Sequence, residues 1–91
     1  MKHAGASALD SLEPLLAQIR GLPGLREKAR GVFYWKGRAF LHFHEDPKGV
    51  FGDVRDDGGV DFDRFEVTGA SGQTALMSAA RARLSRYASK P

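Results

Sequence analysis

His42 and His44 are separated by one residue, in a segment with the alternating polar and apolar pattern of a β-strand. Successive side chains of a strand point to opposite faces of a sheet, so both imidazoles should project from the same face. This spacing occurs in zinc sites in which a third ligand comes from a neighbouring strand. Asp53 is the best-placed third ligand, because in the expected register it lies diagonal to His42 on the adjacent strand. Glu45 and Asp46 at the end of the strand are alternatives.

A simpler interpretation makes the two histidines partly buried polar side chains at a sheet or dimer surface. Neutral imidazoles with a carboxylate would suit zinc, nickel or iron. The sequence contains no cysteine, which excludes a thiolate zinc site, a disulfide scaffold and a thiol nucleophile. We therefore expect no cofactor, with zinc or another divalent transition metal as the alternative.

Common catalytic motifs are missing from the sequence. It has no Gly-x-Ser-x-Gly elbow, no Walker lysine and no Gly-x-Gly-x-x-Gly loop. Ser71, Ser78 and Ser85 lie in or beside an expected helix, with no histidine near them in the sequence. We therefore assign no catalytic residues and favour a binding or interaction domain over an enzyme.

Helical patterns occupy the two ends of the chain. A capping-box pattern at Asp10 opens an expected helix that ends at Gly21. A second helix is expected from about Ser71 to Tyr87, and residues 25–30 are expected to add a helical turn. Residues 1–9 are expected to be flexible. The apolar face of the second helix comprises Leu76, Met77, Ala80, Leu84 and Tyr87.

Between the helices the apolar pattern changes to a period of two, which is typical of strands. The expected strands are Val32–Trp35, Arg38–His44, Gly49–Arg55 and Val60–Val67. Their connections are short and rich in turn-forming residues, which predicts an antiparallel meander. The 91 residues therefore predict a single α+β domain: a two-layer sandwich of helix, four-stranded antiparallel meander and helix, with both helices on one sheet face.

Pairing the strands outward from their loops divides the sheet into two faces. A two-residue turn at Lys36-Gly37 would place Phe33 opposite Phe40. The next two loops would place Phe43 opposite Val50 and Val50 opposite Phe65. The face expected to pack on the helices carries Val32, Tyr34, Ala39, Leu41, Phe43, Val50, Val54, Phe65 and Val67. The opposite face then carries five large aromatic residues: Phe33, Trp35, Phe40, Phe51 and Phe62. Nothing else in the chain can cover these rings, so we predict a homodimer through this face.

Nucleic-acid binding is the main alternative function, because the net charge is +3 and residues 71–91 hold four basic and no acidic residues. One version uses the last helix, through Arg81, Arg83 and Arg86. The other uses the aromatic sheet face as a stacking platform, with arginines among the rings. The arginines on that face are Arg38, Arg55 and Arg64. An acidic middle segment, with eight acids against three basic residues over 45–70, argues against a uniformly basic surface.

Membrane and export signals are also missing. No segment approaches the roughly 18 apolar residues of a membrane span, and the N-terminus lacks the apolar stretch of a secretory signal. We therefore expect a cytoplasmic protein with no membrane partner.

Residues 22–46 contain a Leu-Pro-Gly turn, a Glu-Lys pair, a Lys-Gly-Arg-Ala-Phe strand entry and a His-Glu-Asp loop. In these motifs the segment resembles the start of the MmcQ/YjbR family. The resemblance implies an α/β sandwich of the frataxin-like kind and a DNA-binding role. The second half departs from the family pattern, because one hairpin and a single helix replace its further helices. The run at residues 40–46 also looks like that of small bacterial proteins of unassigned function.

Overall fold

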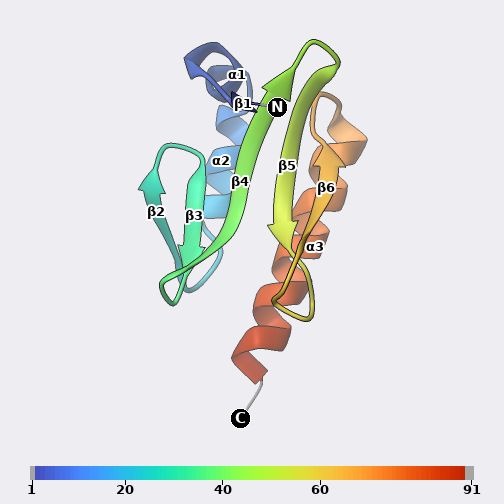
Figure 1. Cartoon of the computed structure of the whole chain (residues 1–91). Helices are drawn as coiled ribbons and strands as arrows, with labels where there is room; N and C mark the ends of the chain where they lie inside the picture. The colour runs from blue at the N-terminus through green and yellow to red at the C-terminus, as the bar shows by residue number, and fades with distance from the viewer. Residues whose placement is uncertain (1, 90–91) are drawn as a thin grey trace.

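The computed structural model describes residues 2–89. An antiparallel sheet with helices on one side gives the α+β fold that the sequence predicts (Figure 1). The strands are β1 (Lys2–His3), β2 (Leu25–Ala29), β3 (Val32–Trp35), β4 (Arg38–Asp46), β5 (Gly49–Arg55) and β6 (Phe62–Glu66). The helices are α1 (Ala6–Ser11), α2 (Glu13–Arg20) and α3 (Ala70–Ser89). Within residues 2–89, no helix is long and apolar enough to cross a membrane.

The sheet contains the expected meander as β3, β4, β5 and β6, widened by two strands. Its order is β2-β3-β4-β5-β6, and β1 pairs with the far end of β4. Figure 1 shows α2 behind β3 and β4, and α3 behind β5 and β6, so both helices cover the same face. Two layers therefore surround one core, as predicted.

The expected helical turn at residues 25–30 is wrong, because this segment forms β2 and pairs with β3. Its sequence, Leu-Arg-Glu-Lys-Ala, contains good helix formers, and helix propensity alone favours a helix. Pairing with β3 overrides that preference. Gly24 and Gly31 bracket the strand at φ of 85° and 78°, a backbone region that favours glycine and ends a regular element.

The first helix also begins earlier than expected. Asp10 is not its N-cap, because the residue lies inside α1. The helix is interrupted at Leu12, and Pro14 lies in the first turn of α2, where its missing N–H costs nothing. The segment expected to be flexible, residues 1–9, contains β1 and the first residues of α1.

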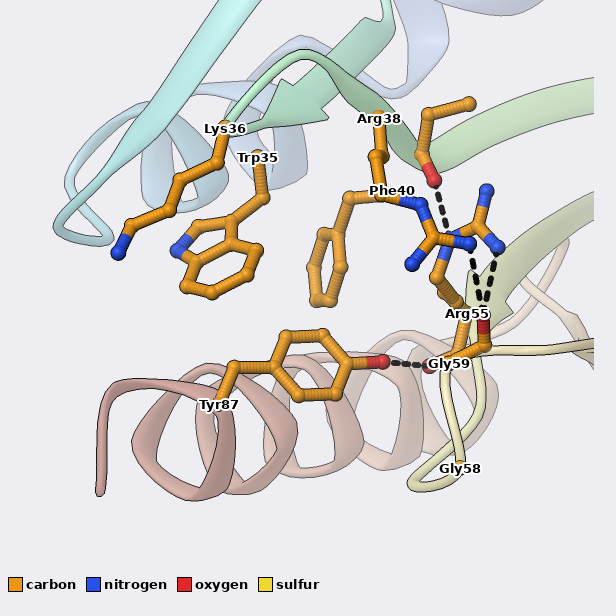
Figure 2. A pocket seen from close by; sticks show the side chains of 9 residues that line it. Trp35, Lys36, Arg38, Phe40, Arg55, Gly58, Gly59 and Tyr87 are labelled. Carbon is orange, nitrogen blue, oxygen red and sulfur yellow. Dashed lines mark hydrogen bonds between the residues drawn. The ribbon is translucent and has the colours of Figure 1, made fainter. Parts of the chain in front are cut away.

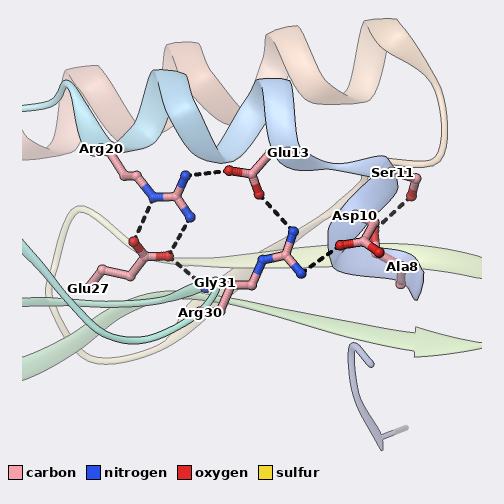
Figure 3. Close-up of polar contacts among 8 residues, drawn as sticks. All are labelled: Ala8, Asp10, Ser11, Glu13, Arg20, Glu27, Arg30 and Gly31. Atoms are coloured by element: carbon pink, nitrogen blue, oxygen red, sulfur yellow. Dashed lines mark hydrogen bonds and ion pairs between the residues drawn. The ribbon is translucent and has the colours of Figure 1, made fainter. Parts of the chain in front are cut away.

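An ion-pair network joins the helices to the β2–β3 hairpin (Figure 3). The Arg20 guanidinium on α2 donates to Glu27 on β2 at 2.6 and 3.1 Å and to Glu13 at 2.6 Å. Arg30 in the hairpin turn donates to Glu13 and to Asp10, both at 2.8 Å. Hydrogen bonds from the two arginines lower the pKa of Glu13. The network holds the edge hairpin against α1 and α2.

A β-bulge in β4 changes which aromatic residues face the helices. The two-residue turn forms as expected, with φ of 50° at Lys36 and 80° at Gly37, so Trp35 pairs with Arg38. The register then shifts by one residue, and Phe33 pairs with Leu41 instead of Phe40. Two consecutive residues of a bulged strand lie opposite one partner residue, so the faces are exchanged beyond this point.

The predicted positions of three aromatics on the outer face were therefore wrong. Phe33 and Phe40 are each 1% exposed in the core, and Trp35 packs against the core from its edge. Val32, Tyr34 and Ala39, expected in the core, are only half-buried. Burial in the core confirms the predictions for four residues of the helix-packing sheet face, Leu41, Phe43, Val54 and Val67. It also confirms four residues of the apolar face of α3, Leu76, Met77, Ala80 and Leu84.

Candidate metal centre

The predicted ligand set meets on the sheet face opposite the helices. His42 and His44 project from β4, and Asp53 on β5 pairs directly with His42. The β4–β5 register differs by two residues from the expected one, so Asp53 lies opposite His42 instead of diagonal to it, on the same face. One possible ligand atom from each of the three residues lies within 4.8 Å of the others.

The polar atoms of this cluster are closely spaced. His42 Nδ1 lies 2.8 Å from His44 Nε2, so one ring nitrogen donates a hydrogen bond to the other. His44 Nε2 lies 3.4 Å from Asp53 Oδ2. Asp53 is only 6% exposed, and such a buried carboxylate requires partners.

Arg64 on β6 supplies the main partner of Asp53. Its Nε and Nη2 atoms donate to the two carboxylate oxygens at 2.8 and 2.9 Å. Burial alone would raise the pKa of Asp53, but the hydrogen bonds and charge of Arg64 lower it below its ordinary value. Asp53 is therefore an anion at neutral pH.

Both histidines of β4 are neutral at neutral pH. Burial lowers the pKa of His42, and the neighbouring His44 lowers it further. Burial also lowers the pKa of His44 by more than the Asp53 carboxylate raises it. Among residues 2–89, His44 Nδ1 is buried without a hydrogen-bond partner. Neutral imidazole is the form that binds metal ions.

A third histidine, which the sequence analysis missed, completes the surroundings. His3 on β1 pairs with His44, and the two rings stack with centroids 5.1 Å apart. All three histidines of the chain therefore lie together. On the other side, the Phe62 ring is 5.0 Å from that of His42. Because the chain has only three histidines, the sequence could have suggested that His3 joins the other two. His3 was left out because it lay in the segment expected to be flexible.

The alternative ligands Glu45 and Asp46 make other contacts. Glu45 accepts a hydrogen bond from the backbone N–H of Gly5 at 2.5 Å. Asp46 accepts one from the backbone N–H of Lys48 at 2.8 Å, inside the β4–β5 turn. These contacts stabilise the N-terminal segment and the turn, and the three-residue cluster does not include either side chain.

Three of the five aromatic rings predicted at the dimer interface lie in the core or pack against it. Phe33 and Phe40 are buried beneath the helices, and Trp35 packs against Tyr87 of α3 with ring centroids 5.1 Å apart. Phe51 and Phe62 keep their predicted place beside the histidines, half-buried. A homodimer through this face stays a prediction.

The six arginines predicted to bind nucleic acid are dispersed among different contacts. Arg64, Arg83 and Arg86 pair with Asp53, Asp63 and Asp57 at 2.8, 2.9 and 3.5 Å. Arg81 is exposed on α3. Arg38 and Arg55 both donate to the carbonyl oxygen of Gly59, at 3.1 and 2.9 Å. Nucleic-acid binding through these residues stays a prediction.

Comparison with known proteins found no matching family model, no matching curated protein and no matching solved structure. The resemblance to the MmcQ/YjbR family therefore stays a prediction, and the function has to be argued from the site itself.

Proposed function

We propose that this protein binds a divalent transition-metal ion through His42, His44 and Asp53. The observation that carries the proposal is the spacing of His42 Nδ1, His44 Nε2 and Asp53 Oδ2 on one sheet face. Rigid neighbouring strands supply all three groups.

Two of the three spacings between donor atoms match those around one ion. Zinc binds imidazole nitrogen at about 2.0–2.1 Å, so two of its ligands lie about 2.9 Å apart at right angles and about 3.3 Å apart at a tetrahedral angle. His42 Nδ1 and His44 Nε2 are 2.8 Å apart, and His44 Nε2 and Asp53 Oδ2 are 3.4 Å apart. An ion could therefore replace the shared imidazole proton with small side-chain movements.

The donor types suit zinc, iron(II) and nickel. Two imidazoles and one carboxylate form a ligand set that these ions accept, and three protein ligands leave positions open for water or a small molecule. Arg64 supplies the supporting contact that fixes the ligating carboxylate. Such a site would bind and present the ion, and the chain would serve as a metal-binding module.

Metal analysis of purified, untagged protein tests the proposal. We expect close to one equivalent of transition metal, or its uptake when zinc is added to protein treated with a chelator. At a zinc concentration 100 times the Kd, binding stabilises the fold by about 2.7 kcal/mol, which raises the Tm by about 10 °C in a domain of this size. His42→Ala and His44→Ala should each abolish both effects.

Asp46→Ala is the matched control, because Asp46 lies on the same strand but only supports a turn. This variant should bind zinc like the unchanged protein. Far-UV circular dichroism verifies that the histidine variants remain folded. Less than about a tenth of an equivalent of metal, together with no rise in Tm on adding zinc, would rule the proposal out.

A further inference from the structure

A second site, independent of the metal centre, lies between the sheet and the C-terminal half of α3 (Figure 2). The pocket has a volume of about 330 Å³, near the lower end of the range for small-molecule sites. Its lining combines three aromatic rings, three basic side chains, two glycines and an alanine. The rings are those of Trp35, Phe40 and Tyr87, and the basic side chains are Lys36, Arg38 and Arg55.

One part of the pocket is aromatic. Figure 2 shows the rings of Trp35 and Phe40 side by side, with the Tyr87 ring facing them from α3. The Tyr87 ring lies 5.1 Å from that of Trp35 and 5.9 Å from that of Phe40, centroid to centroid. Its hydroxyl donates to the backbone carbonyl of Asp56, which fixes the ring in place. Trp35 and Tyr87 are only half-buried and so remain accessible to a planar ligand.

The other part is positively charged. Arg38 and Arg55 share one acceptor, the carbonyl oxygen of Gly59, at 3.1 and 2.9 Å (Figure 2). Arg55 also donates from Nε to the carbonyl of Ala39 at 2.6 Å. Within residues 2–89, neither guanidinium forms an ion pair with a carboxylate, and no acidic residue lines the pocket.

Two neighbouring guanidinium groups bound to a neutral carbonyl repel each other, and an anion between them would remove that cost. A guanidinium has five N–H donors, and within residues 2–89 Arg38 uses one and Arg55 uses two. Unused donors therefore remain on both. A phosphate monoester carries about −1.5 to −2 charges and three acceptor oxygens, so it matches this pair better than a single carboxylate does.

Lys36 adds a third positive charge at the aromatic end. Its ammonium lies over the Trp35 ring, 4.9 Å from the centroid, in a cation–π contact. Lys36 is exposed and lies beyond Trp35, at the opposite end of the pocket from the two guanidinium groups (Figure 2), so its charge attracts an anion to the pocket without contacting the phosphate.

We propose that this pocket binds a nucleoside monophosphate, with the base against Trp35 and Tyr87 and the phosphate held by Arg38 and Arg55. The size of the pocket suits one nucleotide. Stacking on an aromatic ring tolerates any base, so the identity of the base has little effect on affinity.

The single tryptophan of the chain reports directly on this site. In a ¹H–¹⁵N correlation spectrum, titration with AMP should shift the Trp35 indole N–H signal and give a Kd of about 10 to 100 µM. Adenosine and inorganic phosphate should each bind at least tenfold more weakly, because each lacks one half of the ligand. No shift at 1 mM AMP would overturn the proposal, as would adenosine binding as tightly as AMP.

Charge-removing variants locate the phosphate. Arg38→Gln should raise the Kd for AMP about tenfold, since a charge-assisted hydrogen bond to the phosphate is lost. Lys36→Asn should raise the Kd by less, because Lys36 lies at the Trp35 end of the pocket and acts only through its charge. Asn tolerates the positive φ at Lys36. Arg26→Gln, on the exposed edge strand β2, removes the same charge elsewhere and should leave the Kd unchanged. Equal weakening by Arg26→Gln would show nonspecific charge attraction and overturn the proposal.

Titration with a 5′-phosphorylated single-stranded decanucleotide distinguishes recognition of a free nucleotide from recognition of a nucleic-acid chain. Similar affinity for AMP and for the decanucleotide supports recognition of a single nucleotide. Binding of the decanucleotide without binding of AMP would overturn the proposal and favour a nucleic-acid surface instead. The test is independent of the metal centre, because zinc-free protein is used throughout.

Discussion

Arg64 has two opposing effects on the proposed metal centre. Its guanidinium holds both oxygens of Asp53, which orients the carboxylate toward His44. It also places a positive charge beside the position of the cation. The Arg64 side chain is 50% exposed, so water screens that charge, whereas Asp53 is buried and depends on a counter-charge.

Arg64→Leu should therefore lower the Tm of the metal-free protein by several degrees, because Asp53 loses its counter-charge. Zinc should then raise the Tm by more in this variant than in the unchanged protein, since the ion replaces the guanidinium. Thermal melts with a chelator and with zinc measure both effects. A smaller zinc effect in Arg64→Leu would contradict this and show that Arg64 acts mainly by orienting Asp53.

The metal cluster was predictable because it requires only that its side chains lie on the same face of the sheet, and the alternation of side chains along each strand determines that face. The β4–β5 and β5–β6 registers both differ by two residues from those expected, with Phe43 opposite Gly52 and Gly52 opposite Phe65. A shift of two keeps every side chain on its face. The bulge at Phe40 in β4 shifts the β3–β4 register by one, which reverses the faces, and no residue type in the sequence marks that position.

Glu27 connects two elements, β2 and α2, and its charge gives their contact a pH dependence. Hydrogen bonds from Arg20 lower the pKa of Glu27 below its ordinary value. A carboxyl group with a lower pKa in the folded than in the unfolded state stabilises the fold above the unfolded pKa, about 4.3. That contribution is lost as the pH falls through the folded pKa.

Glu27→Gln should lower the Tm at pH 7 by about 3–6 °C, which corresponds to about 1 kcal/mol or less for a partly exposed pair. The amide oxygen still accepts the Gly31 N–H, but the amide nitrogen cannot accept from Arg20, so the charge and one hydrogen bond are lost. The Tm difference from the unchanged protein should shrink below about pH 4. Glu66→Gln, an exposed position on β6, is the control. A difference that is constant from pH 3 to 7 would contradict the assignment.

The start of α3 packs against the end of β6 with no room for a side chain. A Cβ atom at Gly72 would overlap the backbone carbonyl of Glu66, whereas one at Gly69 would meet nothing within 4 Å. Gly72→Ala should therefore cost about 1–3 kcal/mol, because the helix has to move off the strand. Gly69→Ala should change stability by about 0.5 kcal/mol or less. Chemical denaturation measures both, and equal costs would contradict this packing.

At the scale of the whole molecule, β4 belongs to both proposed sites. Arg38 and Phe40 at its start line the nucleotide pocket, and His42 and His44 lie further along on the outer face. The bulge between these two parts turns Phe40 toward α3 while the histidines remain outside. The sequence could not predict the pocket, because it placed Phe40 and Tyr87 on opposite sides of the sheet.

The same bulge weakens the case for a tight homodimer. A stable interface buries about 800 Å² per partner, and a large aromatic side chain contributes about 150–250 Å². With Phe33 and Phe40 in the core and Trp35 packed against it, Phe51 and Phe62 are the two of the five predicted rings that remain on the outer face, and both are already half-buried. A dimer through this face would therefore rest mainly on polar groups around the histidines and would be weak.

Sedimentation velocity should show a monomer at about 10 µM and dimers only at several hundred micromolar, as expected for a small interface. Phe51→Ser should abolish the dimer at the higher concentration, because it removes much of the remaining apolar contact. Val60→Ser is the control, since Val60 is 75% exposed in the β5–β6 connection. A dimer at 10 µM, or one that persists in Phe51→Ser, would place the interface elsewhere.

Because the face also carries His42, His44 and Asp53, dimerisation should slow zinc uptake, and the dilute monomer should bind the ion faster.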